Sequence, residues 1–113
     1  MALADTAKVL GSNDSYKVSS LVKRYTLRDT GFLVTKAGNF QLERSLDPSS
    51  PLTAANKLRV VVSKDMKKLS MSVTTANGLR AVDIFKSPKT ADAVEQYQYV
   101  VDDLIDRNVL EHA

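Results

Sequence analysis

The chain has 113 residues, of which 43% are hydrophobic and 26% charged, and these values are typical of one globular domain over residues 1–113. It contains no cysteine and a single histidine, His112. This composition excludes disulfides, thiolate catalysis, iron–sulfur clusters and multi-histidine metal sites, so we expect neither a metal nor a cofactor. The net charge of +3 is unevenly spread: residues 51–89 carry eight basic and two acidic side chains, and residues 90–113 carry one basic and six acidic.

The first third of the chain predicts short elements. Residues 5–10 and 15–19 have the alternation of short extended segments. The pattern of residues 20–30 is ambiguous, and we favour a helix that is capped by Ser19 or Ser20 and ended by Gly31. Residues 31–37 and 39–46 alternate in polarity around Gly38, which predicts a hairpin whose loop places Gly38 or Asn39 in the left-handed region.

A three-stranded meander is predicted over residues 57–86. The dipeptide Asn77-Gly78 lies between two alternating runs, which is a strong signal for a two-residue hairpin loop. The loop over residues 64–67 joins the first of these strands to the second, and turn length and hydrophobic pattern agree on one register. The predicted pairs are Leu58 with Val73, Val60 with Met71, Val62 with Leu69, Arg59 with Ser72, Val73 with Val82, Met71 with Ile84, Ser72 with Asp83, and Ser70 with Phe85.

Residues 88–111 predict one long helix that begins after an N-cap at Ser87 and has Pro88 in its first turn. Apolar side chains form one half of its helical wheel and acidic side chains form the other. The apolar half comprises Val94, Tyr97, Val100, Val101, Leu104 and Ile105, and the acidic half Asp92, Glu95, Asp102, Asp103 and Asp106. We expect His112 and the other terminal residues, 111–113, to be dispensable for stability.

These elements predict an α+β fold: an antiparallel, meander-like sheet of about five to six strands, with a short N-terminal helix and a long C-terminal helix packed on one face. The order of elements is similar to that of TATA-binding-protein-like folds. The absence of a basic-apolar leader and of an apolar run of about 18 residues predicts a soluble, cytoplasmic protein without membrane contact.

Candidate site residues lie on two predicted surfaces, the outer sheet face and the C-terminal helix. Arg59, Ser72 and Asp83 are expected side by side on the sheet face away from the core, either as a polar floor for a small ligand or as a cross-strand charge pair. Phe85 lies on the same face, where it is either covered or part of a partner site. Tyr99 lies among the acidic residues of the C-terminal helix.

The acidic residues Asp102, Asp103 and Asp106 are interpreted as a solvated helix face rather than as ligands of a hard cation. Together with Tyr99, they fit either a contact surface for a basic partner or a solvated helix with one exposed tyrosine, and we favour the solvated helix. We expect this acidic surface and the basic sheet face to point in opposite directions.

Basic residues form two clusters, and each fits either anion binding or the protection of a sheet edge. The clusters are Lys64, Lys67 and Lys68 in one loop, and Lys23, Arg24 and Arg28 in the ambiguous segment. A net charge of +3 and a single candidate stacking residue, Phe85, argue against nucleic-acid binding. The four glycines do not have the spacing of a nucleotide-binding loop.

Four stretches carry a resemblance to a known family: YTLRDTGF (25–32), TKAGNFQLER (35–44), NGLR (77–80) and IFK (84–86). They resemble a small, functionally uncharacterised family of lactic-acid bacteria that is labelled "putative amino-acid metabolism". The resemblance covers nearly the whole chain and implies a cytoplasmic accessory protein. It provides no catalytic residues that could be carried over to this chain.

From these observations we expect a non-catalytic accessory or binding protein that acts on a protein partner, a second copy of itself or a small anionic ligand. The alternative is a ligand carrier or an enzyme of amino-acid metabolism with a pocket between helix and sheet. A pocket with convergent polar groups would distinguish the two.

Overall fold

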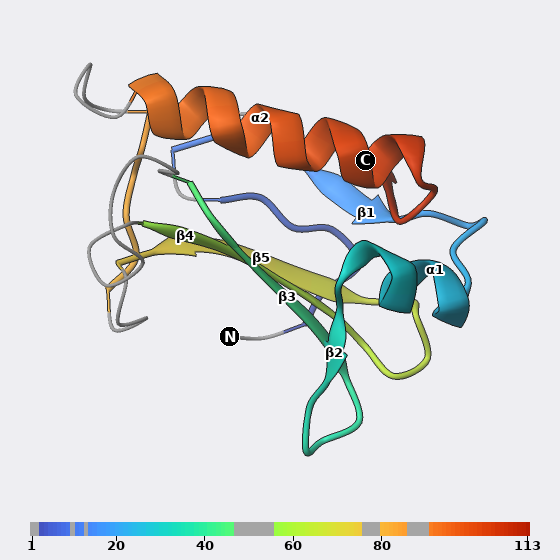
Figure 1. The fold of residues 1–113 in the computed structure, drawn as a ribbon. Coiled ribbons are helices and arrows are strands. Elements are labelled where there is room, and N and C mark those ends of the chain that lie inside the picture. Colours follow the sequence, from blue (N-terminus) through green and yellow to red (C-terminus); the bar gives the residue numbers. More distant parts are fainter. Residues whose placement is uncertain (1–2, 10, 13, 47–55, 76–79, 86–90) are drawn as a thin grey trace.

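The computed structural model describes residues 3–9, 11–12, 14–46, 56–75, 80–85 and 91–113. It contains six strands and two helices, which confirms the α+β class (Figure 1). Four strands form one antiparallel sheet in the order β2-β3-β4-β5, and β1 and β6 form a second sheet of two strands. The elements are β1 (Tyr16–Val18), α1 (Arg24–Thr30), β2 (Leu33–Val34), β3 (Phe40–Ser45), β4 (Lys57–Val62), β5 (Leu69–Thr74), α2 (Ala91–Asp106) and β6 (Leu110–His112).

The β4–β5 hairpin confirms the predicted register. Leu58 lies opposite Val73, Val60 opposite Met71, and Val62 opposite Leu69. These six side chains are at most 5% exposed, because every second residue of both strands faces α2 across the core. On the other face, Arg59 lies opposite Ser72 as predicted.

The prediction of a third strand in the meander is confirmed for its first residues only and is wrong beyond them. Thr74 forms an isolated bridge with Ala81, and the Val82 N–H donates to the Val73 carbonyl at 2.8 Å, so the register begins as predicted. The chain then leaves the sheet and residues 84–85 form a turn. Ile84 still reaches the core and is fully buried. The predicted Asn77-Gly78 turn lies outside the described residues.

Residues 33–45 confirm the first predicted hairpin, with Val34 opposite Phe40. Gly38 has φ +89° and therefore takes the left-handed conformation that favours glycine. Helix α1 is also confirmed, but its N-cap is Lys23, which makes no side-chain cap bond. Ser19 instead closes the turn before the helix, where its hydroxyl oxygen accepts the Leu21 N–H at 3.1 Å.

Helix α2 spans Ala91–Asp106 and so ends well short of residue 111. Asn108 has φ +61°, its N–H donates to the Ile105 carbonyl, and the Val109 N–H donates to the Leu104 carbonyl. These two bonds form a Schellman motif, which ends a helix even where the apolar pattern continues. The predicted N-cap at Ser87 lies outside the described residues.

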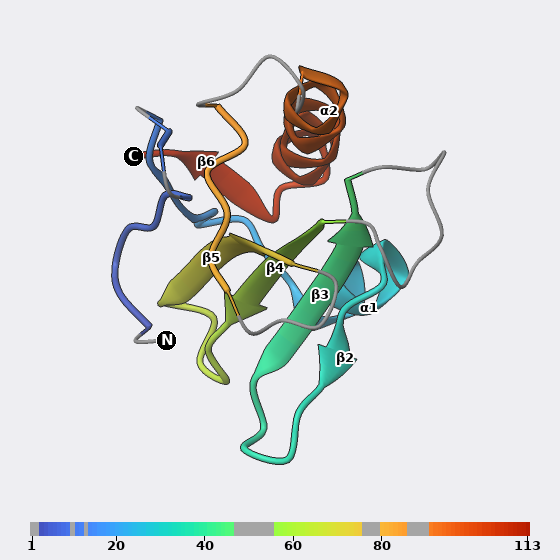
Figure 2. The same ribbon diagram turned by 90° about the vertical axis from the view of Figure 1, so that its left-hand side faces the viewer.

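Beyond this motif the chain forms β6, which pairs antiparallel with β1 (Figure 2). Tyr16 lies opposite His112, with their ring centroids 5.2 Å apart. Lys17 and Glu111 form an ion pair at 3.5 Å, and the Ala113 N–H donates to the Ser15 carbonyl at 3.1 Å. These contacts tie residues 111–113 to β1, and the expectation that they are dispensable for stability stays a prediction.

The core lies between α2 and the four-stranded sheet, with α2 crossing above the sheet in Figure 1. The apolar half of the helix points inward as predicted: Tyr97, Val101 and Leu104 are at most 2% exposed. The N-terminal segment joins the two sheets, because Ala4 bridges to Leu69 of β5 and Ala7 bridges to Tyr16 of β1.

Candidate functional site

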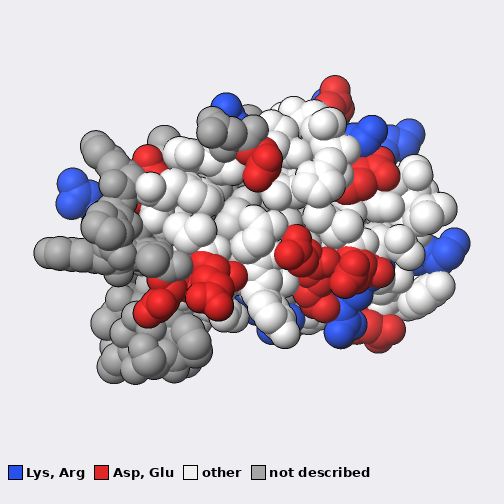
Figure 3. All heavy atoms as spheres, turned by 90° about the horizontal axis from the view of Figure 1, so that it is seen from above, with Lys and Arg blue, Asp and Glu red and all other residues white. Residues whose placement is uncertain are grey.

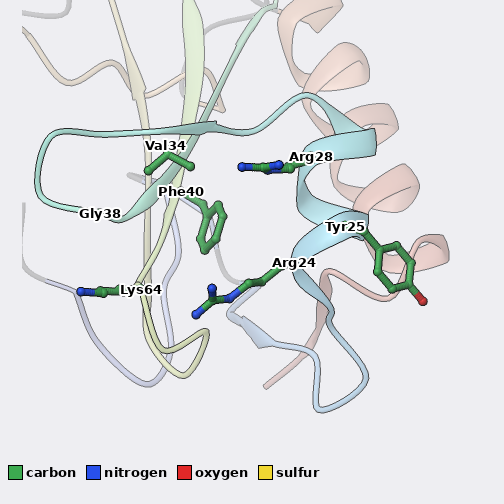
Figure 4. Close-up of a pocket in the computed structure, with 7 residues that line it drawn as sticks. All are labelled: Arg24, Tyr25, Arg28, Val34, Gly38, Phe40 and Lys64. Carbon is green, nitrogen blue, oxygen red and sulfur yellow. The ribbon is translucent and has the colours of Figure 1, made fainter.

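A groove of about 600 Å³ lies between α1, the β2–β3 hairpin and the loop after β4 (Figure 4). Its lining combines three cationic side chains with an apolar floor. The lining residues are Arg24, Tyr25, Arg28, Val34, Gly38, Phe40 and Lys64.

The floor of the groove is the Phe40 ring, which is 6% exposed and belongs to the core. Val34, opposite Phe40 in the hairpin, is 54% exposed and extends the apolar surface. The Lys64 side chain runs past Gly38, so that a Cβ at this position would lie 3.4 Å from Lys64 Cδ. That distance is an ordinary van der Waals contact, so the position favours glycine because of its left-handed φ and not because of the lysine stem.

Arg24 and Arg28 lie one helical turn apart, so they project from the same side of α1. Figure 4 shows both side chains extending from the helix toward Phe40 and the hairpin, whereas Tyr25 points away from the hollow. Helix α1 is held in place by Leu27, which is fully buried. It ends at Gly31 (φ +111°), whose N–H donates to the carbonyl of Arg28.

Among the residues that the structure describes, the cations of the groove have no counter-ion. Among the described residues, Arg24, Arg28 and Lys64 take part in no ion pair, while Arg59 binds Glu43 at 2.7 Å. Like charges gathered around a shared concavity repel one another, and a bound anion relieves that repulsion. The groove thus has the electrostatic and apolar character of a site for an organic anion.

The predicted Arg59–Ser72–Asp83 row is not assembled. Arg59 reaches the other neighbouring strand, where Glu43 of β3 lies directly opposite it and accepts from Nε and from Nη2. The Asp83 carboxylate accepts the Phe85 N–H at 2.9 Å, in the turn that replaces the third strand. Arg59 pairs with Glu43 because Glu43 lies directly opposite it on the neighbouring strand β3, whereas Asp83 would lie beyond Ser72.

Ser72 and Asp83 instead lie near a second hollow of about 610 Å³, between β5 and the N-terminal segment. Ser72 is one of its lining residues, and its Oγ is buried with no hydrogen-bond partner among the described residues. Asp83 packs against Gly11, which also lines the hollow, so closely that a Cβ at Gly11 would clash with the carboxylate.

Phe85 lies on the helix side of the sheet, not on the outer face where the predicted third strand would have put it. Its ring packs edge-on against Tyr97 of α2, with centroids 5.6 Å apart, and it is 37% exposed. Burial raises the pKa of Tyr97, whose hydroxyl has no hydrogen-bond partner in the described part of the chain.

The outer face of α2 is acidic, as predicted, and Figure 3 shows the acidic side chains gathered on it. Tyr99 is 75% exposed. Asp102 accepts from Gln98 at 3.0 Å, Asp103 pairs with Arg107 at 3.2 Å, and Asp106 is exposed. Within the described ranges, no group of three or more acidic or histidine side chains could hold a metal ion. A basic partner for this face stays a prediction.

The groove joins the two basic clusters of the sequence, which are separated by about forty positions. Sequence reasoning identified Arg24, Arg28 and Lys64 as cations but treated their clusters separately, and it assigned Phe40 and Val34 only to a hairpin. One signal in the sequence pointed to the groove: in a helix over residues 24–30, Arg24 and Arg28 are four residues apart and therefore lie on the same side.

Comparisons with known proteins identify one family. A family model with the description "DUF1831: Putative amino acid metabolism" matches residues 1–111. The crystal structure of a DUF1831 family protein from Lactobacillus plantarum is 41% identical, with a TM-score of 0.90, and the alignment covers 100% of this chain and 99% of that one. No curated protein matches the chain. In the part of the chain that the structure describes, no helix has the length and apolar character needed to span a membrane.

Proposed function

We propose that this protein, which belongs to the DUF1831 family, binds a small organic anion in the groove between α1 and the β2–β3 hairpin. The observation that carries the proposal is the pair Arg24 and Arg28, which extend over the buried Phe40 ring without a partner among the described acidic residues (Figure 4).

The two kinds of lining suggest the two parts of the ligand. A guanidinium group presents paired N–H donors that match a carboxylate or a phosphate. Phe40 and Val34 offer apolar surface for a hydrocarbon or ring portion. The family description is consistent with such a ligand, because the compounds of amino-acid metabolism commonly carry a carboxylate.

The groove supports a binding role better than a chemical one. Its described lining contains no carboxylate, and Tyr25, which could act as an acid, points away from the hollow. General acid–base catalysis needs a positioned proton donor or acceptor beside the ligand. The groove supplies charge and apolar contact instead, so we assign it to recognition by an accessory or carrier protein.

The test is an NMR titration with hexanoate, with hexanol as the neutral probe. We expect hexanoate to shift the amide signals of α1, of Phe40 and of Lys64, and hexanol to bind more weakly. The double variant Arg24→Gln/Arg28→Gln should weaken hexanoate binding about ten-fold or more, because hydrogen bonds to charged groups contribute about 1.5–3 kcal/mol each.

The matched control is Lys17→Gln/Arg107→Gln, which removes the same charge from β1 and from the end of α2. This control should leave hexanoate affinity unchanged. An equal loss in both double variants would show that net charge, not the groove, attracts the anion, and would contradict the proposal. Shifts confined to residues outside the groove would contradict it as well.

A further inference from the structure

A third hollow, of about 500 Å³, adjoins the groove and shares Arg24 and Lys64 with it. Its remaining lining residues are Asn39, Ser63, Asp65 and Lys68. Because they share these residues, the two hollows lie next to each other on one surface. The groove has the apolar floor of Phe40, and the third hollow has a polar lining.

The loop that carries Lys64 and Lys68 is held by its own hydrogen bonds. The Ser63 Oγ accepts the N–H groups of Lys67 and Lys68 at 3.2 and 3.0 Å, and donates to the Asp65 carboxylate. Met66 takes the left-handed conformation, with φ +60°. A loop tied in this way presents its two lysines in a defined arrangement before any ligand arrives.

Asp65 is the one acidic side chain among the described residues that line this hollow, and it hydrogen-bonds within the loop. Its Oδ1 accepts the Ser63 hydroxyl and the Lys67 N–H at 3.1 Å. The hydrogen bond from Ser63, followed by that from Lys67, holds the pKa of Asp65 below its usual range. Its charge is therefore directed at the loop backbone, while Arg24, Lys64 and Lys68 leave the hollow with an excess of positive charge.

Asn39 adds a neutral donor. Its Oδ1 accepts the Lys64 N–H at 3.1 Å, which ties the β2–β3 hairpin to the loop after β4. This bond leaves the Nδ2 donors of Asn39 for another acceptor. Among the described residues, neither Lys64 nor Lys68 takes part in an ion pair.

We infer that the ligand is an elongated organic dianion. One anionic group lies between Arg24 and Arg28, the hydrocarbon portion lies on Phe40, and the second anionic group lies against Lys64, Lys68 and the Asn39 amide. This inference rests on the proposed function and extends it, because a ligand with one charge would leave the cations of the third hollow uncompensated.

The experiment compares dicarboxylates with monocarboxylates of equal chain length: succinate with butanoate, adipate with hexanoate, and suberate with octanoate. We expect at least one dicarboxylate to bind about five-fold or more tightly than its monocarboxylate, as one added ion pair in a partly solvated site would give. Lys68→Gln should abolish this advantage and leave the affinity for the monocarboxylate unchanged.

The matched control is Lys67→Gln, in the same loop, because Lys67 is exposed and does not line the hollow. The control should keep the full advantage of the dicarboxylate. If Lys67→Gln removes as much dicarboxylate affinity as Lys68→Gln, the tighter binding of dicarboxylates comes from the summed positive charge of the loop and not from the hollow. That result overturns the inference.

The failure of this inference is distinguishable from that of the proposed function. If hexanoate binds and depends on Arg24 and Arg28, but no dicarboxylate binds more tightly, the ligand has one charge and only the inference fails. If neither class of acid depends on the arginines, both fail. A third measurement, with 6-phosphonohexanoate, tests the chemistry of the second anionic group. Tighter binding than adipate, with the same dependence on Lys68, supports a phosphate-bearing ligand. Weaker binding than adipate supports a dicarboxylate.

Discussion

The groove beside α1 and the outer face of α2 are the two strongly charged regions of this molecule, and they are built in opposite ways. The groove is concave and collects cations from a helix and a distant loop around the buried Phe40 ring. The face of α2 is convex, and all its acidic residues come from one short stretch of chain. Two of them have partners close by in the sequence: Asp102 binds Gln98 of the same helix, and Asp103 binds Arg107, the first residue after the helix.

This difference supports the proposal that the charges of the groove, and not those of α2, serve recognition. Charges on a convex helix face are solvated and form only weak ion pairs or hydrogen bonds with neighbouring side chains, so they contribute little to stability or affinity. Charges brought together in a hollow, without partners, remain uncompensated until an anion binds. The exposed aromatic residue differs in the same way: Tyr99 stands in solvent, whereas Phe40 belongs to the core.

The largest expected effect comes from the two aromatic residues of these regions. Phe40→Ala should lower the free energy of unfolding by about 3–5 kcal/mol, because it removes a buried ring and leaves a cavity. Tyr99→Ala, the matched change on the acidic face, should alter it by about 0.5 kcal/mol or less. Denaturant unfolding measures both, and a comparable loss in Tyr99→Ala would contradict the assignment of this face to solvent.

An intermediate effect is expected from deletion of residues 111–113, which anchor the end of the α2 region to β1. The deletion removes the Lys17–Glu111 ion pair, uncovers the buried Tyr16 ring and breaks the Ala113–Ser15 hydrogen bond. We expect a loss of about 1–2 kcal/mol, and a melting temperature lower by about 5–10 °C. Glu111→Gln serves as the control, since loss of one exposed pair changes stability little.

A shift of no more than a couple of degrees on this deletion would instead support the expectation from the sequence. It would mean that the β1–β6 pairing contributes nothing to the folded state.

The smallest effect is expected from charge reversal on α2, with Asp102, Asp103 and Asp106 changed together to lysine. The variant loses one ion pair with Arg107 but places cations near a helix C-terminus, where they are favoured by the helix dipole. The free energy of unfolding should change by about 1 kcal/mol or less. Hexanoate affinity should also stay within about two-fold of the native value, because exposed charges more than about 10 Å apart are screened. A large change in hexanoate affinity would show that the two regions act as one electrostatic surface.

The parts of the fold that could be predicted from sequence are those whose contacts are local. The β4–β5 register followed from a short loop and two alternating strands, because a slip by one residue would expose Leu58, Val60 and Val62. The end of α1 followed from Gly31, and the apolar face of α2 followed from helical spacing. In each case neighbours in the sequence are neighbours in space.

The errors arose where a distant segment competed with a local pattern. Residues 82–85 alternate like a strand, but Ile84 and Phe85 turn toward α2, where Ile84 is buried and Phe85 packs on Tyr97. The apolar pattern of α2 continues into Leu110, but Asn108 takes the left-handed conformation and the chain returns as β6. Arg59 was assigned to Asp83 because the pairing of β3 with β4 was not predicted, and that pairing brings Glu43 opposite Arg59.

By itself, the sequence determined the α+β class, the central hairpin, the amphipathic helix and the identity of the charged residues, since periodicity and turn chemistry depend on neighbouring positions. Only the tertiary structure decided that Arg24, Arg28 and Lys64 surround one hollow, that Phe40 is its floor, and that the C-terminus pairs with β1. These arrangements depend on the packing of α1 against the β2–β3 hairpin and on the return of the chain after Asn108. Such contacts join residues far apart in the chain, and their energies depend on burial that no local pattern specifies.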